Sequence, residues 1–173
     1  MRVIAGSIKG RRLQAPAEGV RPTADRAREA LFSILQRWPQ GPFLDLFAGT
    51  GAVALEAWSR GYAPVAGVER DPEALACARA NARGTGLQLL AQDARRLRPD
   101  AFPPQAVVFA DPPYEASAEL WLAMAPRVKP WLRPDGLLVW ETGHPGLLPA
   151  AEGLELLEAR RYGAAVFHLV RPA

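Results

Sequence analysis

Residues 43–51 read Phe-Leu-Asp-Leu-Phe-Ala-Gly-Thr-Gly, or FLDLFAGTG. The apolar residues at 43–48 predict a buried strand, and the glycines that follow predict a turn whose backbone can approach a ligand closely. A helix is expected next, from about Ala52 to Arg60, where Gly61 stops it. A strand, a glycine loop and a helix in this order predict one unit of an α/β sheet with a ligand at the strand end.

The same alternation continues along the chain. Further strands are expected at 65–69, 87–91, 106–110 and 137–141, and further helices at 71–83 and 117–131. Residues 154–170 predict two more strands around Gly163, forming an antiparallel C-terminal hairpin. The fold class expected is therefore α/β: a Rossmann-like, mostly parallel seven-stranded sheet with helices on both faces.

A basic segment precedes this sheet. Residues 1–40 hold eight basic and three acidic residues, a net charge of +5, so the rest of the chain carries −2 of the total of +3. Short strand-like pieces at 2–14 predict a small hairpin, and Thr23 is expected to cap a helix that reaches Trp38. We interpret 1–40 as a basic extension and 41–173 as the α/β domain of what is effectively a single domain. A basic extension on a slightly acidic body suggests a polyanionic partner.

Composition excludes several classes of function. The chain has 173 residues and is 49% hydrophobic, which suits one globular domain. No apolar run approaches the roughly 20 residues that cross a bilayer, and the N-terminus lacks the apolar core of a signal peptide, so a cytoplasmic protein without a membrane partner is expected. Cys77 is the only cysteine, and no set of His, Cys and acidic residues has the spacing of metal ligands. We therefore expect neither a disulfide nor a metal.

Acids lie at or just after the ends of the first three predicted strands. Asp45 lies near the end of the first strand, and Glu69 ends the second, where it can accept hydrogen bonds from ribose hydroxyls. Asp93 follows the third and can accept the exocyclic amine of adenine. Residues 49–54 also fit the G-x-G-x-x-A pattern, which leaves a NAD-binding oxidoreductase as an alternative. Asp45 disfavours that alternative, because a carboxylate repels a pyrophosphate but suits the cationic amine of S-adenosylmethionine (SAM).

The fourth strand runs into Asp111-Pro112-Pro113-Tyr114, or DPPY. The prolines restrict the backbone and hold its carbonyls in one orientation. Asp111 and a proline carbonyl can accept both N–H bonds of an sp² amino group, and Tyr114 can stack on a flat base. This strand end is suited to holding an amine that accepts a methyl group.

The glycine loop, the acids after the second and third strands, and DPPY resemble class I SAM-dependent methyltransferases that act on amino groups. The runs at 2–6 (RVIAG), 9–13 (KGRRL) and 21–32 (RPTADRAREALF) resemble the RsmD family of 16S ribosomal RNA guanine-N2 methyltransferases. The resemblance covers nearly the whole chain, although the tail after Gly143 carries no family motif. It implies methyl transfer from SAM, with S-adenosylhomocysteine as product, to guanine in an assembled or partly assembled small subunit. We expect the protein to be a monomer.

The expected site divides into three groups of residues. The catalytic group is Asp111, Pro112, Pro113 and Tyr114. The cofactor-binding group is Asp45, Ala48, Gly49, Thr50, Gly51, Glu69, Arg70, Asp93, Ala94 and Thr23. The RNA-binding group is Arg2, Lys9, Arg11, Arg12 and Arg21.

Other acceptors of a methyl group remain open. Adenine N6 of a nucleic acid and a protein glutamine are both amino groups, but enzymes of those types more often carry Asn where Asp111 stands. The basic extension disfavours the glutamine. A non-catalytic RNA-binding module on a nucleotide fold is a further alternative.

Overall fold

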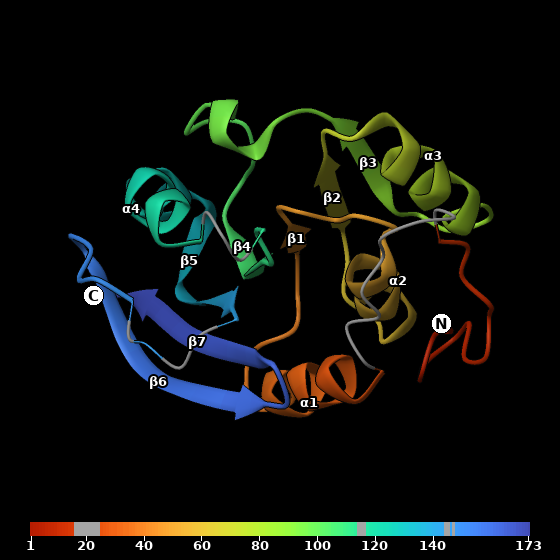
Figure 1. Cartoon of the computed structure of the whole chain (residues 1–173), viewed down its shortest axis with the longest axis horizontal. Helices are drawn as coiled ribbons and strands as arrows, with labels where there is room; N and C mark the ends of the chain where they lie inside the picture. The colour runs from red at the N-terminus through yellow and green to blue at the C-terminus, as the bar shows by residue number, and fades with distance from the viewer. Residues whose placement is uncertain (16–24, 114–116, 144–145, 147) are drawn as a thin grey trace.

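Seven strands form one sheet in the order β3-β2-β1-β4-β5-β7-β6 (Figure 1). The computed structural model describes residues 1–15, 25–113, 117–143, 146 and 148–173. The strands are β1 (Phe43–Asp45), β2 (Val65–Glu69), β3 (Gln88–Ala91), β4 (Gln105–Ala110), β5 (Leu132–Thr142), β6 (Leu154–Tyr162) and β7 (Ala165–Pro172). Strands β1 to β5 pair in parallel, whereas β7 runs antiparallel to both β5 and β6. The predicted sheet and its C-terminal hairpin are confirmed.

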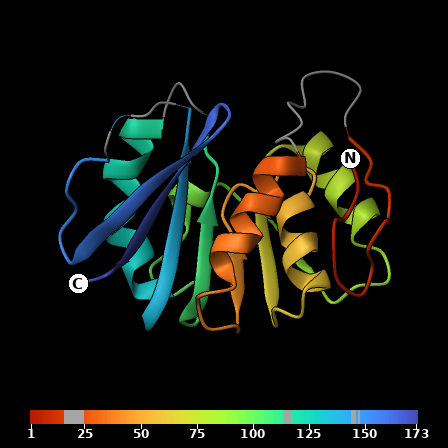
Figure 2. The same cartoon turned by 90° about the horizontal axis from the view of Figure 1, so that it is seen from below.

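Helices cover both faces of the sheet. They are α1 (Asp25–Leu35), α2 (Ala52–Ser59), α3 (Pro72–Asn81) and α4 (Ser117–Val128), with short 3₁₀ turns η1 (Ala94–Arg96) and η3 (Lys129–Trp131). One core cluster joins the sheet to α1 and α2, and a second joins it to η1 and α4. Phe43 of β1 belongs to the first cluster and Leu44 to the second, because successive strand residues point to opposite faces. Figure 2 shows the parallel strands upright, with their carboxyl ends toward the top.

Several predicted elements differ from the structure in their bounds. Strand β5 begins at Leu132 and not at residue 137, and α1 and α4 end at Leu35 and Val128, three residues before their predicted ends. The first strand ends at Asp45 instead of Ala48. The chain turns out of the sheet after Asp45, and the Oδ1 atom of Asp45 accepts a hydrogen bond from the Phe47 N–H (3.3 Å) in this turn. The predicted N-terminal hairpin has a single bridge, between Arg2 and Arg12, rather than two strands. No helix in the described part of the chain is long and apolar enough to cross a membrane.

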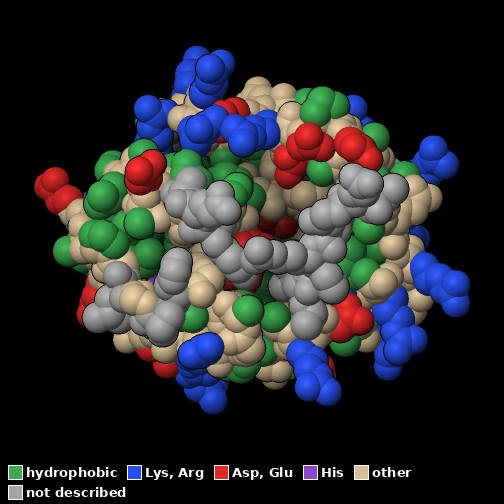
Figure 3. Space-filling view, in the orientation of Figure 1, with side chains coloured by type: hydrophobic (Ala, Val, Ile, Leu, Met, Phe, Trp, Pro, Cys, Tyr) green, Lys and Arg blue, Asp and Glu red, His purple; other side chains and the backbone are tan. Residues whose placement is uncertain are grey.

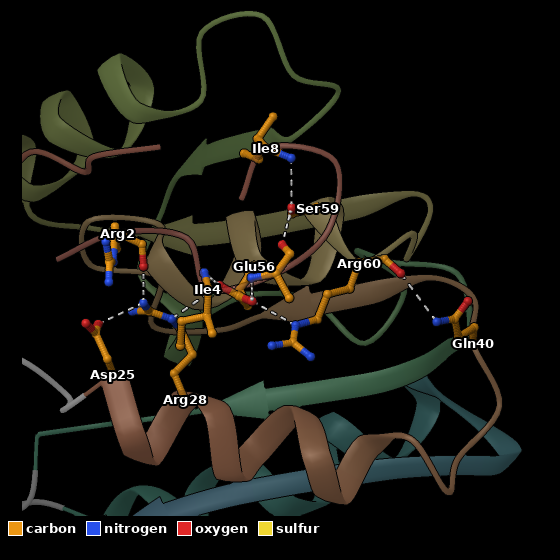
Figure 4. Close-up of polar contacts among 10 residues, drawn as sticks. Arg2, Ile4, Ile8, Asp25, Arg28, Gln40, Glu56, Ser59 and Arg60 are labelled. Atoms are coloured by element: carbon orange, nitrogen blue, oxygen red, sulfur yellow. Dashed lines mark hydrogen bonds and ion pairs between the residues drawn. The ribbon is translucent and has the colours of Figure 1, made fainter. Parts of the chain in front are cut away.

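A buried carboxylate on α2 anchors the N-terminal segment, residues 1–15. Glu56 is fully buried and accepts a hydrogen bond from the backbone N–H of Ile4 (2.7 Å), as Figure 4 shows. It also accepts one from the backbone N–H of Ala5 (3.0 Å). Its other contacts are with Arg60, whose Nε lies 2.7 Å from Oε1, and with Arg28, whose Nε lies 3.6 Å from Oε2. Glu56 therefore joins α1, α2 and the N-terminal segment.

Arg28 contributes to the packing of α1 and not to a basic surface. Its side chain is 1% exposed, and its Nη2 donates to the Arg2 carbonyl and to Asp25 Oδ1. One turn further along α2, Ser59 accepts the Ile8 N–H through Oγ (3.1 Å). Gly6 passes so close that a Cβ there would lie 1.8 Å from the Ser59 carbonyl oxygen, and its φ of +86° also favours glycine. The N-terminal segment is thus held along the length of α2.

Replacing Glu56 by alanine is expected to lower the free energy of unfolding by about 3–5 kcal/mol. The change removes the acceptor of two backbone N–H groups and the buried one of the two carboxylates that face Arg28, which then keeps only the exposed Asp25. Urea denaturation followed by circular dichroism measures the effect. The control is Glu73→Ala, which removes an exposed carboxylate from α3 and is expected to cost less than about 1 kcal/mol. Equal losses in the two variants would contradict this role of Glu56.

Candidate functional site

Four acids lie in a row at the carboxyl ends of four adjacent strands. In sheet order they are Glu69 on β2, Asp45 on β1, Asp111 directly after β4 and Glu141 on β5. Each stands two or four residues after a side chain of the cluster under α1 and α2, so the alternation of the strands places all four on that face of the sheet. Figure 3 looks onto this edge and shows acidic side chains in the hollow at its centre.

Glu141 is the member of the row that the sequence interpretation missed. It is 1% exposed and is the next-to-last residue of β5. The pairing of Ala110 with Trp140 brings Asp111 and Glu141 to neighbouring positions one residue later. The sequence did contain a signal for Glu141. It stands two residues after Val139 and four after Leu137, so the alternation of a strand places it on the same face of the sheet as these two apolar residues.

The Asp45 carboxyl is buried and close to other acids. Burial raises its pKa from 3.8 to about 8; hydrogen bonding by the Phe47 N–H opposes the shift, and the charges of Asp111 and Glu69 add to it. A positive charge placed beside this carboxyl would favour its ionised form. The site is therefore suited to a cation and unsuited to a phosphate.

Asp111 lies at the end of a fully buried strand. Burial raises its pKa to about 6, so it is mostly ionised at neutral pH and can still accept a proton. Pro112 beside it is buried and Pro113 is exposed. Tyr114, the last residue of the predicted catalytic group, lies outside the described residues.

The glycine loop is held by Glu69. The N–H of Gly49 donates to Glu69 Oε2 and the N–H of Asp71 donates to Oε1, both at 2.7 Å. Gly51 caps α2 with a φ of +78°, a conformation that favours glycine. Each carboxylate oxygen of Glu69 keeps capacity for a further hydrogen bond, so a ribose hydroxyl can bind beside the loop.

Asn81 connects the glycine loop to the N-terminal segment. This buried residue at the end of α3 donates to the carbonyls of Thr50 (2.9 Å) and Gln14 (3.0 Å) and accepts the Gln14 N–H (2.7 Å). Arg11 reinforces the connection, because its Nη1 donates to the carbonyls of Asn81 (3.3 Å) and Arg83 (3.0 Å) at the same helix end. The sequence carried no signal for Asn81, because the contact depends on how α3 packs.

Asp93 is paired with arginine. Its carboxylate accepts hydrogen bonds from Arg95, which lowers its pKa to about 2, and Arg70 Nη1 lies 3.6 Å away. Ala94 is buried and begins η1. Asp93 and Ala94, which were predicted to contact adenine, thus lie together after the end of β3, and the Asp93 carboxylate already accepts hydrogen bonds from Arg95.

The predicted RNA-binding side chains fall in different environments. Arg2, Lys9 and Arg12 are exposed, whereas Arg11 is partly buried at the end of α3. Arg21 and the predicted cofactor residue Thr23 lie outside the described residues. Across the part of the chain that is described, no group of three or more His, Cys, Asp or Glu side chains is arranged to hold a metal ion.

The family described as conserved hypothetical protein 95 matches residues 1–171. The chain belongs to this family. It is similar to ribosomal RNA small subunit methyltransferase D of Haemophilus influenzae, at 32% identity over 185 residues that cover 98% of this chain and 92% of that protein. It is also similar to the solved structure of a hypothetical protein from Thermus thermophilus, with a TM-score of 0.87, 35% identity and 99% of each chain covered.

A TehB-like SAM-dependent methyltransferase of Corynebacterium glutamicum shares the fold, with a TM-score of 0.67 at 15% identity over 87% of this chain and 89% of that one. The prediction of an RsmD-family member is confirmed by the family match and by the Haemophilus relative. The predictions of a Rossmann-like fold and of a methyltransferase are confirmed with it.

The buried Asp45 carboxyl is expected to make the ligand-free protein less stable as the pH rises from about 4 to about 8. In that window the folded chain keeps a proton that the unfolded chain has lost, so raising the pH favours unfolding. Asp45→Asn removes the ionisable group, and with it this pH-dependent loss of stability, and keeps an oxygen acceptor for the Phe47 N–H. The difference in melting temperature between variant and wild type should therefore move in favour of the variant from pH 5 to pH 8.

The control for this series is Asp135→Asn, which changes an exposed carboxyl on β5. Its melting temperature is expected to follow that of the wild type at every pH. If the melting temperatures of Asp45→Asn and of the wild type changed with pH in parallel, the ionisation assigned to Asp45 would be contradicted.

Proposed function

We propose that this protein transfers the methyl group of SAM to the exocyclic N2 amine of a guanine in small-subunit ribosomal RNA. The relative from Haemophilus influenzae is named a small-subunit rRNA methyltransferase, which supports the class of substrate. The observation that carries the proposal is Asp111, an acid after a rigid buried strand in the row of four carboxyls. The RsmD resemblance favours an assembled or partly assembled subunit as substrate. We expect the enzyme to be monomeric and cytoplasmic.

The acids at the strand ends fit SAM better than a dinucleotide. SAM brings an amine and a sulfonium, both cationic, and supplies an electrophilic methyl group. Asp45 would hold the amine, and the resulting ion pair would lower the cost of ionising this buried carboxyl. Glu69 would hold the ribose, and the backbone of Ala48 to Gly51 would pass beside it. Arg70, Asp93 and Ala94 would border the adenine.

Asp111 would act on the amine of the base. The lone pair of guanine N2 is delocalised into the ring, so N2 is a weak nucleophile. A carboxylate that accepts an N–H of N2 raises its electron density and fixes its direction, while the Pro112 carbonyl accepts the second N–H. As the bond from N2 to the methyl carbon forms, the bond from that carbon to the sulfur of SAM would break, and S-adenosylhomocysteine would leave with the electron pair. One proton must also leave N2, and a carboxyl with a pKa of about 6 can accept it.

The exposed Arg2, Lys9 and Arg12 would bind RNA phosphates. They belong to a segment that Glu56 and Asn81 hold against α2 and the glycine loop. Phosphate contacts would therefore have a set position relative to the reacting groups, and positioning of this kind supplies roughly 7–11 kcal/mol in well-oriented reactions.

Product analysis tests the proposal. The protein is incubated with methyl-labelled SAM and, in separate reactions, with undermethylated small subunits, naked small-subunit rRNA and DNA. We expect label in RNA, recovered after nucleoside digestion as N2-methylguanosine. Label in N6-methyladenosine or in DNA would contradict the proposal.

Asp111→Ala is expected to lower kcat by about 10²–10⁴-fold, because it removes the acceptor of the N2 proton. The affinity for SAM, measured by calorimetry, should stay within about threefold, since the direct cofactor contacts belong to other residues. The control Asp135→Ala removes an exposed acid on β5 and should keep the wild-type kcat. Methyl transfer by Asp111→Ala at the wild-type rate would rule out the role.

A further inference from the structure

A second basic surface borders the strand ends, away from the N-terminal segment. We call its members the rim arginines: Arg70, Arg95, Arg96, Arg98 and Arg127. They come from the turn after β2, from η1 and the residues that follow it, and from the last turn of α4. All five are exposed. Figure 3 shows Lys and Arg side chains gathered at the top of the view, over the segment that Figure 1 places after β3.

The backbone beneath these arginines is fixed by packing. Leu97, between Arg96 and Arg98, is 2% exposed and belongs to the cluster under α4. The indole of Trp131 donates to the Pro99 carbonyl (2.8 Å), and Arg127 Nη1 donates to the Arg95 carbonyl (2.9 Å). The backbone that carries Arg95, Arg96 and Arg98 is therefore held in place by contacts with Arg127 and Trp131.

The surface keeps a positive charge despite its ion pairs. Asp93 pairs with Arg95 and lies 3.6 Å from Arg70, and Asp100 pairs with Arg98 at 3.2 Å. Five arginines against these two acids leave a net charge of +3. Among the described residues, Arg96 and Arg127 have no carboxylate within 4.0 Å, so these two are available to an anion.

The two basic surfaces lie on opposite faces of the sheet. The segment after β3 packs with α4 in the second core cluster, whereas Val3 and Leu13 of the N-terminal segment pack with Leu55 of α2 and Ala82 beyond α3. The row of carboxyls lies between them. The carboxyls repel phosphates, whereas the rim arginines and the N-terminal segment attract them. A polynucleotide that delivers one base to Asp111 is therefore held best if it contacts both basic surfaces.

We propose that the rim arginines bind phosphates of the substrate RNA on the side of the site opposite to the N-terminal segment. This inference rests on the proposed function. The RNA backbone crosses the strand ends with phosphates at both rims, and the target base turns inward between them. Turning a base out of its stack costs a few kcal/mol, which phosphate contacts on both sides offset. The ligand is thus a strand whose target nucleotide is unpaired or easily flipped.

A double charge reversal, Arg96→Glu with Arg98→Glu, tests this inference. The dissociation constant for the naked small-subunit rRNA is measured over a range of salt concentrations. We expect at least a tenfold weaker affinity and a smaller salt dependence, because each lost phosphate contact reduces the logarithmic slope by about 0.7. Arg96→Lys with Arg98→Lys keeps the charge and should retain most of the affinity.

The matched control is Arg37→Glu with Arg171→Glu, which makes the same change in net charge on exposed residues at the opposite edge of the sheet, before β1 and near the end of β7. Its RNA affinity is expected to stay within about threefold of wild type. Wild-type affinity in the rim variant, or equal weakening in the control, would overturn the inference. Thermal shift by SAM, measured on every variant, checks that the cofactor site is intact.

A failure of the inference about the rim arginines can be distinguished from a failure of the proposed function. If the wild-type protein transfers no methyl group to small-subunit RNA, the proposed function is wrong whatever the rim variants bind. If it does transfer methyl groups and the rim variant keeps wild-type KM and kcat for RNA, only the assignment of the rim arginines is wrong.

Discussion

Parallel pairing of β1 with β2 and β4 determines where the carboxyls of the proposed site lie. The register places Asp45 opposite Gly67 on one side and Phe109 on the other, so the strand ends that carry Glu69 and Asp111 flank it. A shift of one residue would turn each of these side chains to the other face of the sheet. Because β1 is buried in both core clusters, such a shift would also expose its apolar residues. Core packing and site geometry therefore depend on the same register.

The same edge separates the charges of the molecule. Carboxyls occupy the strand ends, where burial and mutual repulsion raise the pKa of Asp45, and arginines occupy the borders. An acidic centre suits a cationic cofactor and an amine, and basic borders suit the phosphates that carry the base. The N-terminal segment belongs to this arrangement because Glu56 and Asn81 fix it to α2 and to the glycine loop.

The sequence predicted the elements of the fold well, and the site in part. Short apolar strands and glycine turns are local signals, so β2 was predicted at its observed bounds. Glu56 and Arg28 could not be recognised, because charged residues on a helix are normally solvated and their burial depends on how α1 and α2 pack. The partner of Asp93 was missed for a related reason: the pairing with Arg95 depends on the tight turn at η1. Both cases involve contacts that a periodic pattern does not encode.

In the proposed reaction, the methyl group reaches N2 of a guanine that Asp111 holds. The most direct test compares two small-subunit RNAs that differ only at the target nucleotide, guanosine in one and inosine in the other. Inosine lacks the N2 amine and keeps the rest of the base. We expect the protein to transfer labelled methyl to the target guanosine and none to the inosine at the same position, and to bind both RNAs with similar affinity. Equal methylation of the two nucleotides would contradict the proposed reaction.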